Sequence, residues 1–104
     1  MKASLLIHRE EVLHDGKYVV IIKVYEVEKS KKFPDGIKAK FVLQNAEEGF
    51  ARLLVDNHQP YGFHMHTKLP HDRDHREILD VENHEEALAF FLVEVERIVK
   101  NEEK

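Results

Sequence analysis

Eleven residues of this chain, DNHQPYGFHMH, carry side chains that could do chemistry. They run from Asp56 to His66 and include three of the eight histidines. Residues 63–67 alternate in a way that predicts a short strand, on which His64 and His66 point to the same face. His58 precedes this pair, and the proline and glycine between them can turn the chain back toward it. The sequence therefore predicts two imidazoles on one surface and leaves open whether His58 joins them.

Such a group suits cleavage of RNA by its own 2′-hydroxyl, which needs a base, an acid and a cation for the charge that develops on the phosphate. Histidine titrates near neutral pH and serves in either proton role. We expect His64 and His66 to transfer the protons. Asp56 or Asn57 would orient one ring, and His58 is a further catalytic candidate. The cations expected to bind substrate are Lys38, Lys40, Arg52 and Lys68.

Two other roles for this segment stay open. His58, His64 and His66 are ligand types that a divalent metal such as zinc accepts. However, the chain has no cysteine and no H-E-x-x-H pattern, so the strong zinc signatures are missing. The segment could also be a polar loop, because an Asp-Asn pair often forms a turn. We would then expect a non-catalytic module that binds another protein. Cleavage of RNA by the histidines, in contrast, requires no cofactor.

Length and charge narrow the class of protein. The 104 residues predict a single domain over residues 1–104. The net charge of −4 argues against avid nucleic-acid binding, yet seven lysines and only three acidic residues lie between residues 17 and 40. The early apolar run LLI is too short for a signal peptide or a membrane span. We therefore expect a soluble cytoplasmic protein with no membrane partner.

The apolar pattern predicts strands before the histidine segment and a helix after it. An Asp15-Gly16 turn predicts a hairpin that pairs Leu13 with Tyr18 and Val12 with Val19. The expected strands cover residues 3–13, 17–29, 37–44, 50–55, 63–67 and 78–81.

The expected helix begins after Asn83, which caps it together with Glu86. Its apolar stripe consists of Leu88, Phe91, Leu92, Val95, Ile98 and Val99, of which Phe91, Leu92, Val95 and Val99 are expected to pack on the sheet. The fold class is thus α+β, with an antiparallel meander of four to six strands and one C-terminal helix packed on one face. The other face, which carries lysines, stays free for a partner, and we expect a homodimer.

The order of residues in the histidine segment resembles a known family. Asp56-Asn57, His58, Gly62, His64 and His66, after a strand ending in RLLVD, are similar to a segment of the TumE-type toxins of type II toxin–antitoxin modules. The opening hairpin, KASLLIHREEVLHDG, and the final helix, HEEALAFFLVEVERIVKNE, are similar in outline. The resemblance implies an RNA-cleaving toxin neutralised by a helix-turn-helix antitoxin. It also implies that Asp56, Asn57, His58, His64 and His66 are the functional positions.

Overall fold

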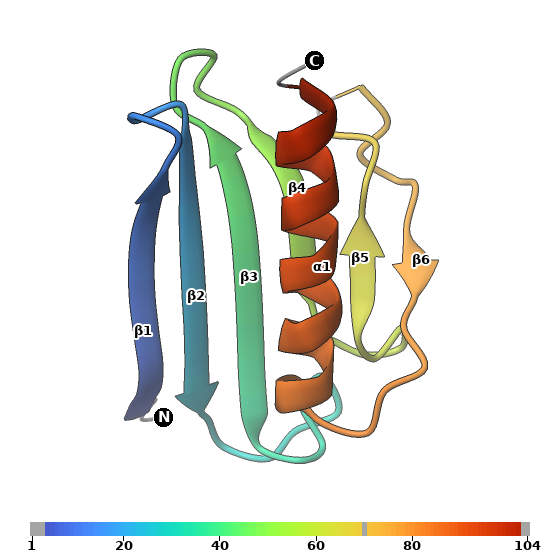
Figure 1. Ribbon diagram of the computed structural model, residues 1–104. Coiled ribbons are helices and arrows are strands. Elements are labelled where there is room, and N and C mark those ends of the chain that lie inside the picture. The colour runs from blue at the N-terminus through green and yellow to red at the C-terminus, as the bar shows by residue number, and fades with distance from the viewer. Residues whose placement is uncertain (1–3, 70, 103–104) are drawn as a thin grey trace.

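The computed structural model describes residues 4–69 and 71–102, which form one antiparallel sheet and one helix (Figure 1). The strands follow one another across the sheet in chain order, so the sheet is an open meander. Their bounds are β1 Ser4–Leu13, β2 Tyr18–Glu26, β3 Ile37–Asn45, β4 Ala51–Asp56, β5 His64–His66 and β6 Glu77–Ile78. The helix is α1, His84–Glu102. The α+β class, the meander and the C-terminal helix expected from the sequence are confirmed.

The first hairpin has the expected register, with Leu13 opposite Tyr18 and Val12 opposite Val19. The Lys17 amide donates to the His14 carbonyl oxygen at 3.2 Å and closes the turn. Asp15 and Gly16 both have positive φ angles, 55° and 91°, as a type I′ turn requires. At the far edge β6 is shorter than the expected strand at residues 78–81, because β5 offers it only two paired positions.

The hydrophobic core lies between one face of the sheet and α1, which crosses in front of β3 and β4 (Figure 1). Alternate residues of β2 to β5 supply the sheet side, and residues about one helical turn apart supply the other. The core consists of Tyr18, Val20, Ile22, Val24, Ala39, Phe41, Leu43, Leu53, Val55, Met65, Ala87, Phe91, Val95 and Val99.

The start of α1 follows the expected capping pattern. The Asn83 side-chain oxygen accepts the Glu86 amide at 3.0 Å, and the Glu86 carboxylate accepts the Glu82 amide at 3.0 Å. One expectation for the helix is wrong: Leu92 is 43% exposed, whereas Phe91 is fully buried. The helix lies over β3 and β4, so Leu92 points past the sheet toward the end of the first hairpin, where it borders a surface groove with Leu13.

The opposite face of the sheet, which no helix of the described residues covers, carries polar residues in adjoining positions. Because paired residues point to the same side, the register places Tyr25 beside Lys38, and Lys40 beside both Lys23 and Asp56. No helix in the described part of the chain is long and apolar enough to cross a membrane.

Substitutions of Phe91 and Phe90 test which face of α1 packs on the sheet. Phe91→Ala should lower the free energy of unfolding by about 3–5 kcal/mol, because it leaves a cavity against Phe41, whose ring centroid lies 5.6 Å away. Phe90→Ala is the matched control. Phe90 is half exposed, so its loss should change stability by about 0.5 kcal/mol or less. Urea unfolding of both variants checks this, and similar losses would contradict the assigned helix face.

Candidate functional site

The pairing of β4 with β5 positions the histidine pair. Val55 lies opposite Met65, and both are in the core. Their neighbours therefore point to the other face, where Asp56 lies opposite His64. His64 and His66 thus share a face, as expected. His64 is fully buried and His66 is 8% exposed.

The loop between β4 and β5 closes over His64 and brings the rings of His58 and Tyr61 to it, beside the His66 ring on β5. The centroid of the His58 ring lies 4.7 Å from that of His64, that of Tyr61 lies at 5.5 Å, and that of His66 at 5.2 Å. The sequence left open whether His58 reaches the pair, and the structure brings its ring to that of His64. The Arg76 guanidinium lies 4.1 Å from the centroid of the Tyr61 ring.

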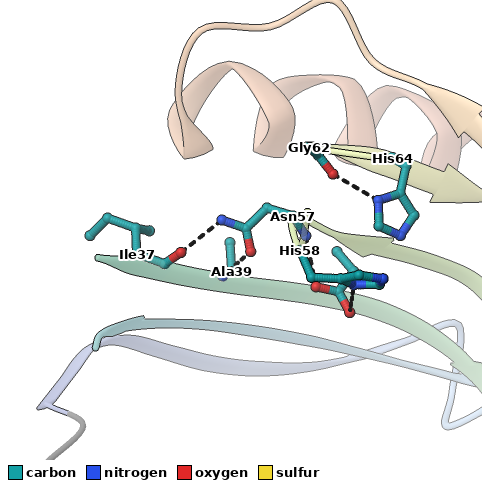
Figure 2. A network of polar contacts seen from close by, with 7 residues as sticks. Ile37, Ala39, Asn57, His58, Gly62 and His64 are labelled. Carbon is teal, nitrogen blue, oxygen red and sulfur yellow. Dashed lines mark hydrogen bonds and ion pairs between the residues drawn. The ribbon is translucent and has the colours of Figure 1, made fainter. Parts of the chain in front are cut away.

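Backbone carbonyls fix the protonated nitrogen of both strand histidines. The Nδ1 atom of His64 lies 2.7 Å from the Gly62 carbonyl oxygen (Figure 2), and that of His66 lies 3.1 Å from the His75 carbonyl oxygen. Because a carbonyl only accepts, each Nδ1 carries the hydrogen and each neutral ring keeps its lone pair on Nε2. Burial lowers the pKa of His64 from its ordinary value, and the nearby His58 ring lowers it further, while the Gly62 carbonyl opposes the change. His64 is therefore neutral at neutral pH.

His58 and Asp56 form the more accessible part of the site. A carboxylate oxygen of Asp56 lies 3.4 Å from Nδ1 of His58, and the two side chains are 23% and 30% exposed, respectively. The other carboxylate oxygen of Asp56 accepts the Asn57 amide at 2.7 Å, which holds the carboxylate in place. Asp56 thus orients His58, and not His64 or His66 as the sequence suggested, and leaves Nε2 of His58 as the ring atom for a substrate.

The Asn57 side chain forms hydrogen bonds with main-chain atoms of β3. Its side-chain nitrogen donates to the Ile37 carbonyl at 2.8 Å, and its side-chain oxygen accepts the Ala39 amide at 3.0 Å (Figure 2). The amide group therefore continues the pairing of β3 beyond the end of β4 and anchors the loop that carries His58. Both of its polar atoms are engaged by main chain, so Asn57 anchors the loop in this structure, and its expected role at a histidine ring stays a prediction.

Of the expected cations, Lys40 lies opposite Asp56 across β3 and β4. Lys38 follows on the same exposed face of β3. Arg52 lies toward the other end of β4, beside an irregularity in the β3–β4 register, and Lys68 is exposed beyond β5.

Arg76 and Tyr61 were missed by sequence reasoning. Tyr61 lay within the motif and could have been included for its position there. Arg76 lies just before β6, and its approach depends on the pairing of β6 with β5, which no local spacing encodes.

Within the described residues, three buried side-chain atoms have no hydrogen-bond partner: Nε2 of His64, Nε2 of His75 and Nε of Arg76. Buried polar atoms are nearly always paired, so three from the residues around one loop mark a polar site. Among residues 4–69 and 71–102, no group of three or more histidine or acidic side chains is arranged to hold a metal ion. The geometry therefore does not support His58, His64 and His66 as a zinc site.

Comparisons with protein-family models, curated proteins and solved structures found no significant match to this chain.

Loss of the Asn57 side chain should destabilise the protein although the residue is not in the core. Asn57→Ala leaves the Ala39 amide and the Ile37 carbonyl without their partner, and should lower the free energy of unfolding by about 1–3 kcal/mol. Asn101→Ala, at an exposed helix position, is the control and should be near neutral. Urea unfolding measures both, and equal values would argue against the anchoring role.

The buried His64 should make stability depend on pH. The pKa of His64 is lowered below 6.5 in the folded protein, so above pH 6.5 both states are neutral and the full stability is present. As the pH falls below 6.5, the unfolded chain binds a proton before the folded chain does, so the free energy of unfolding decreases.

His64→Gln should therefore lose less stability than the wild type between about pH 7.5 and about pH 5.5. His71→Gln, in an exposed loop, should keep the wild-type decrease. Urea unfolding at the two pH values tests this. A decrease in His64→Gln as large as in the wild type would contradict the burial of a neutral His64.

Proposed function

We propose that this protein cleaves RNA without a metal ion, with His58 as the group that exchanges a proton with the substrate. The observation that carries the proposal is the partly exposed Asp56–His58 pair, seated on the buried ring of His64. A carboxylate that orients an imidazole is a common way to prepare a base. Lys40 and Arg76 lie on either side as cations.

The reaction would be transfer of the phosphate to the 2′-oxygen of the same nucleotide. His58 takes the proton of the 2′-hydroxyl at Nε2, and the 2′-oxygen attacks phosphorus. The bond to the 5′-oxygen breaks, and that oxygen receives a proton from the Tyr61 hydroxyl, whose ring centroid lies 5.8 Å from that of His58. Lys40 and Arg76 stabilise the negative charge on phosphorus. The products are a 2′,3′-cyclic phosphate and a free 5′-hydroxyl.

In this proposal His64 supports the reaction instead of performing it. Its side chain is fully buried beneath His58 and Tyr61, so the expectation that it contacts substrate is revised. Because burial keeps the pKa of His64 low, the ring stays neutral and does not repel the proton that His58 acquires. His66 borders a separate surface pocket with Leu54 and Arg73, and its Nδ1 lies against the His75 carbonyl.

The biological role that we propose is that of a toxin in a toxin–antitoxin module, acting in the cytoplasm. It rests on the residue order Asp-Asn-His, Gly, His-x-His that resembles the TumE-type toxins. A cognate helix-turn-helix antitoxin would neutralise the toxin by covering the sheet face that carries Lys40 and His58.

Cleavage of a single-stranded RNA by the purified protein in EDTA tests the enzyme. The wild type should cleave, and His58→Ala should be slower by about 100-fold or more, because general base catalysis contributes at least that factor. Tyr61→Phe, which keeps the ring and its contact with Arg76, should also be slower. His71→Ala is the control and should cleave at the wild-type rate. Absence of wild-type cleavage, its loss in EDTA, or full activity of His58→Ala would overturn the proposal.

A further inference from the structure

We infer that a pocket beside the histidine loop binds an unpaired base of the RNA substrate and places the neighbouring phosphate at His58. The pocket lies between the end of β2, the start of β3 and the loop that joins them, and Tyr25, Glu28, Ser30, Lys32, Phe33 and Lys38 line it. The inference rests on the proposed ribonuclease function and names the substrate-binding part of the same site.

The loop that forms the pocket is held in shape by its own hydrogen bonds. The Phe33 amide donates to the Ser30 hydroxyl oxygen at 3.1 Å, and the Ser30 amide donates to the Phe33 carbonyl at 3.1 Å. The Val27 amide donates to the Gly36 carbonyl at 2.8 Å and closes the base of the loop. Gly36 has a φ of 72°, and a Cβ there would lie 3.0 Å from the Val27 carbonyl oxygen. The pocket therefore exists before a ligand arrives.

The residue types favour a base as the occupant. Tyr25 and Phe33 offer aromatic rings, and bases stack on such rings with little regard to sequence. The Lys32 ammonium lies 5.8 Å from the centroid of the Phe33 ring, and Lys38 pairs with Tyr25 across the strands, so cations flank both aromatics. Glu28 also lines the pocket; its carboxylate repels a phosphate but accepts hydrogen bonds from the N–H groups of a base. The phosphates of the bound strand therefore lie outside the pocket, where the lysines can pair with them.

The pocket is joined directly to the proposed catalytic loop. The Gln59 amide, one residue after His58, donates to the Lys32 carbonyl at 3.0 Å. Lys38 and Lys40 project from the same face of β3, about 6.5–7 Å apart at Cα, and Lys40 lies opposite Asp56. A strand whose base occupies the pocket would thus pass Lys38 and then Lys40 before reaching His58. Three of the seven lysines between residues 17 and 40 lie along this path: Lys32, Lys38 and Lys40.

Binding of an RNA that cannot be cleaved tests the pocket separately from catalysis. A short fluorescent single-stranded oligonucleotide with 2′-O-methyl groups lacks the attacking hydroxyl, so its anisotropy reports affinity alone. Tyr25→Ala and Phe33→Ala should each weaken binding by about 10-fold, as expected when a base loses a stacking partner. Tyr25→Phe should retain binding because it keeps the ring. Phe90→Ala, which removes an exposed aromatic from the helix, is the matched control and should bind like the wild type.

The outcomes distinguish the inference from the proposed function. Wild-type affinity in both alanine variants, or no binding by the wild type at micromolar concentration, would overturn the pocket even if the protein cleaves RNA. Aromatic-dependent binding by a protein that does not cleave would support the pocket and overturn the ribonuclease. Loss of binding in Tyr25→Phe as well would mean that the substitution disturbs the strand, and would also count against stacking. Urea unfolding of each variant confirms that it is folded.

Discussion

The register between β4 and β5 is the constraint on which the rest of the site depends. Val55 opposite Met65 places two apolar side chains in the core, and Asp56 and His64 consequently lie on the other face. A slip of β5 by one residue would turn Met65 to the open face of the sheet and His64 and His66 into the core. Burial of apolar side chains on one face thus determines where the polar side chains meet on the other.

The site combines a rigid buried layer with a more accessible layer above it. His64 is fixed by its bond to the Gly62 carbonyl, and burial keeps its pKa low and its ring neutral. His58 and Asp56 lie above it at the start of the loop, and Asn57 attaches that loop to the edge of β3. Asp56 and His58 are thereby held by the main-chain bonds of Asn57 on one side and by the His64 ring on the other. Such support is what a group that must meet a substrate in one orientation requires.

Much of the fold could be predicted from the sequence because its signals are local and agree. The Asp15-Gly16 turn determines the first register, alternation determines the strands, and Asn83 with Glu86 determines where the helix begins. The prediction that Leu92 packs on the sheet was wrong, because the apolar stripe of a helix does not determine how far the helix is shifted across the sheet. The side chain therefore meets solvent although its spacing is that of a core residue.

The site was predictable only in part. Strand alternation was enough to place His64 and His66 on one face, whereas the turn signals at Pro60 and Gly62 left open whether His58 reaches them. The burial of each ring could not be predicted, because His64 is covered by a loop whose path depends on long-range contacts. The role of Asn57 depends on the main chain of Ile37 and Ala39, twenty and eighteen residues earlier, and Arg76 arrives through the pairing of β6. Residue type and spacing therefore indicated which side chains lie together, whereas the burial and hydrogen-bond partners of each one depend on the fold.

The most direct test of the central claim is the chemical identity of the RNA ends that the purified protein produces in EDTA. Attack by the 2′-hydroxyl, with His58 as base, predicts a 2′,3′-cyclic phosphate on one fragment and a 5′-hydroxyl on the other. It also predicts no cleavage at a position where a single 2′-deoxynucleotide replaces the ribonucleotide. Fragments that carry a 5′-phosphate, cleavage at the deoxy position, or intact RNA would contradict the account.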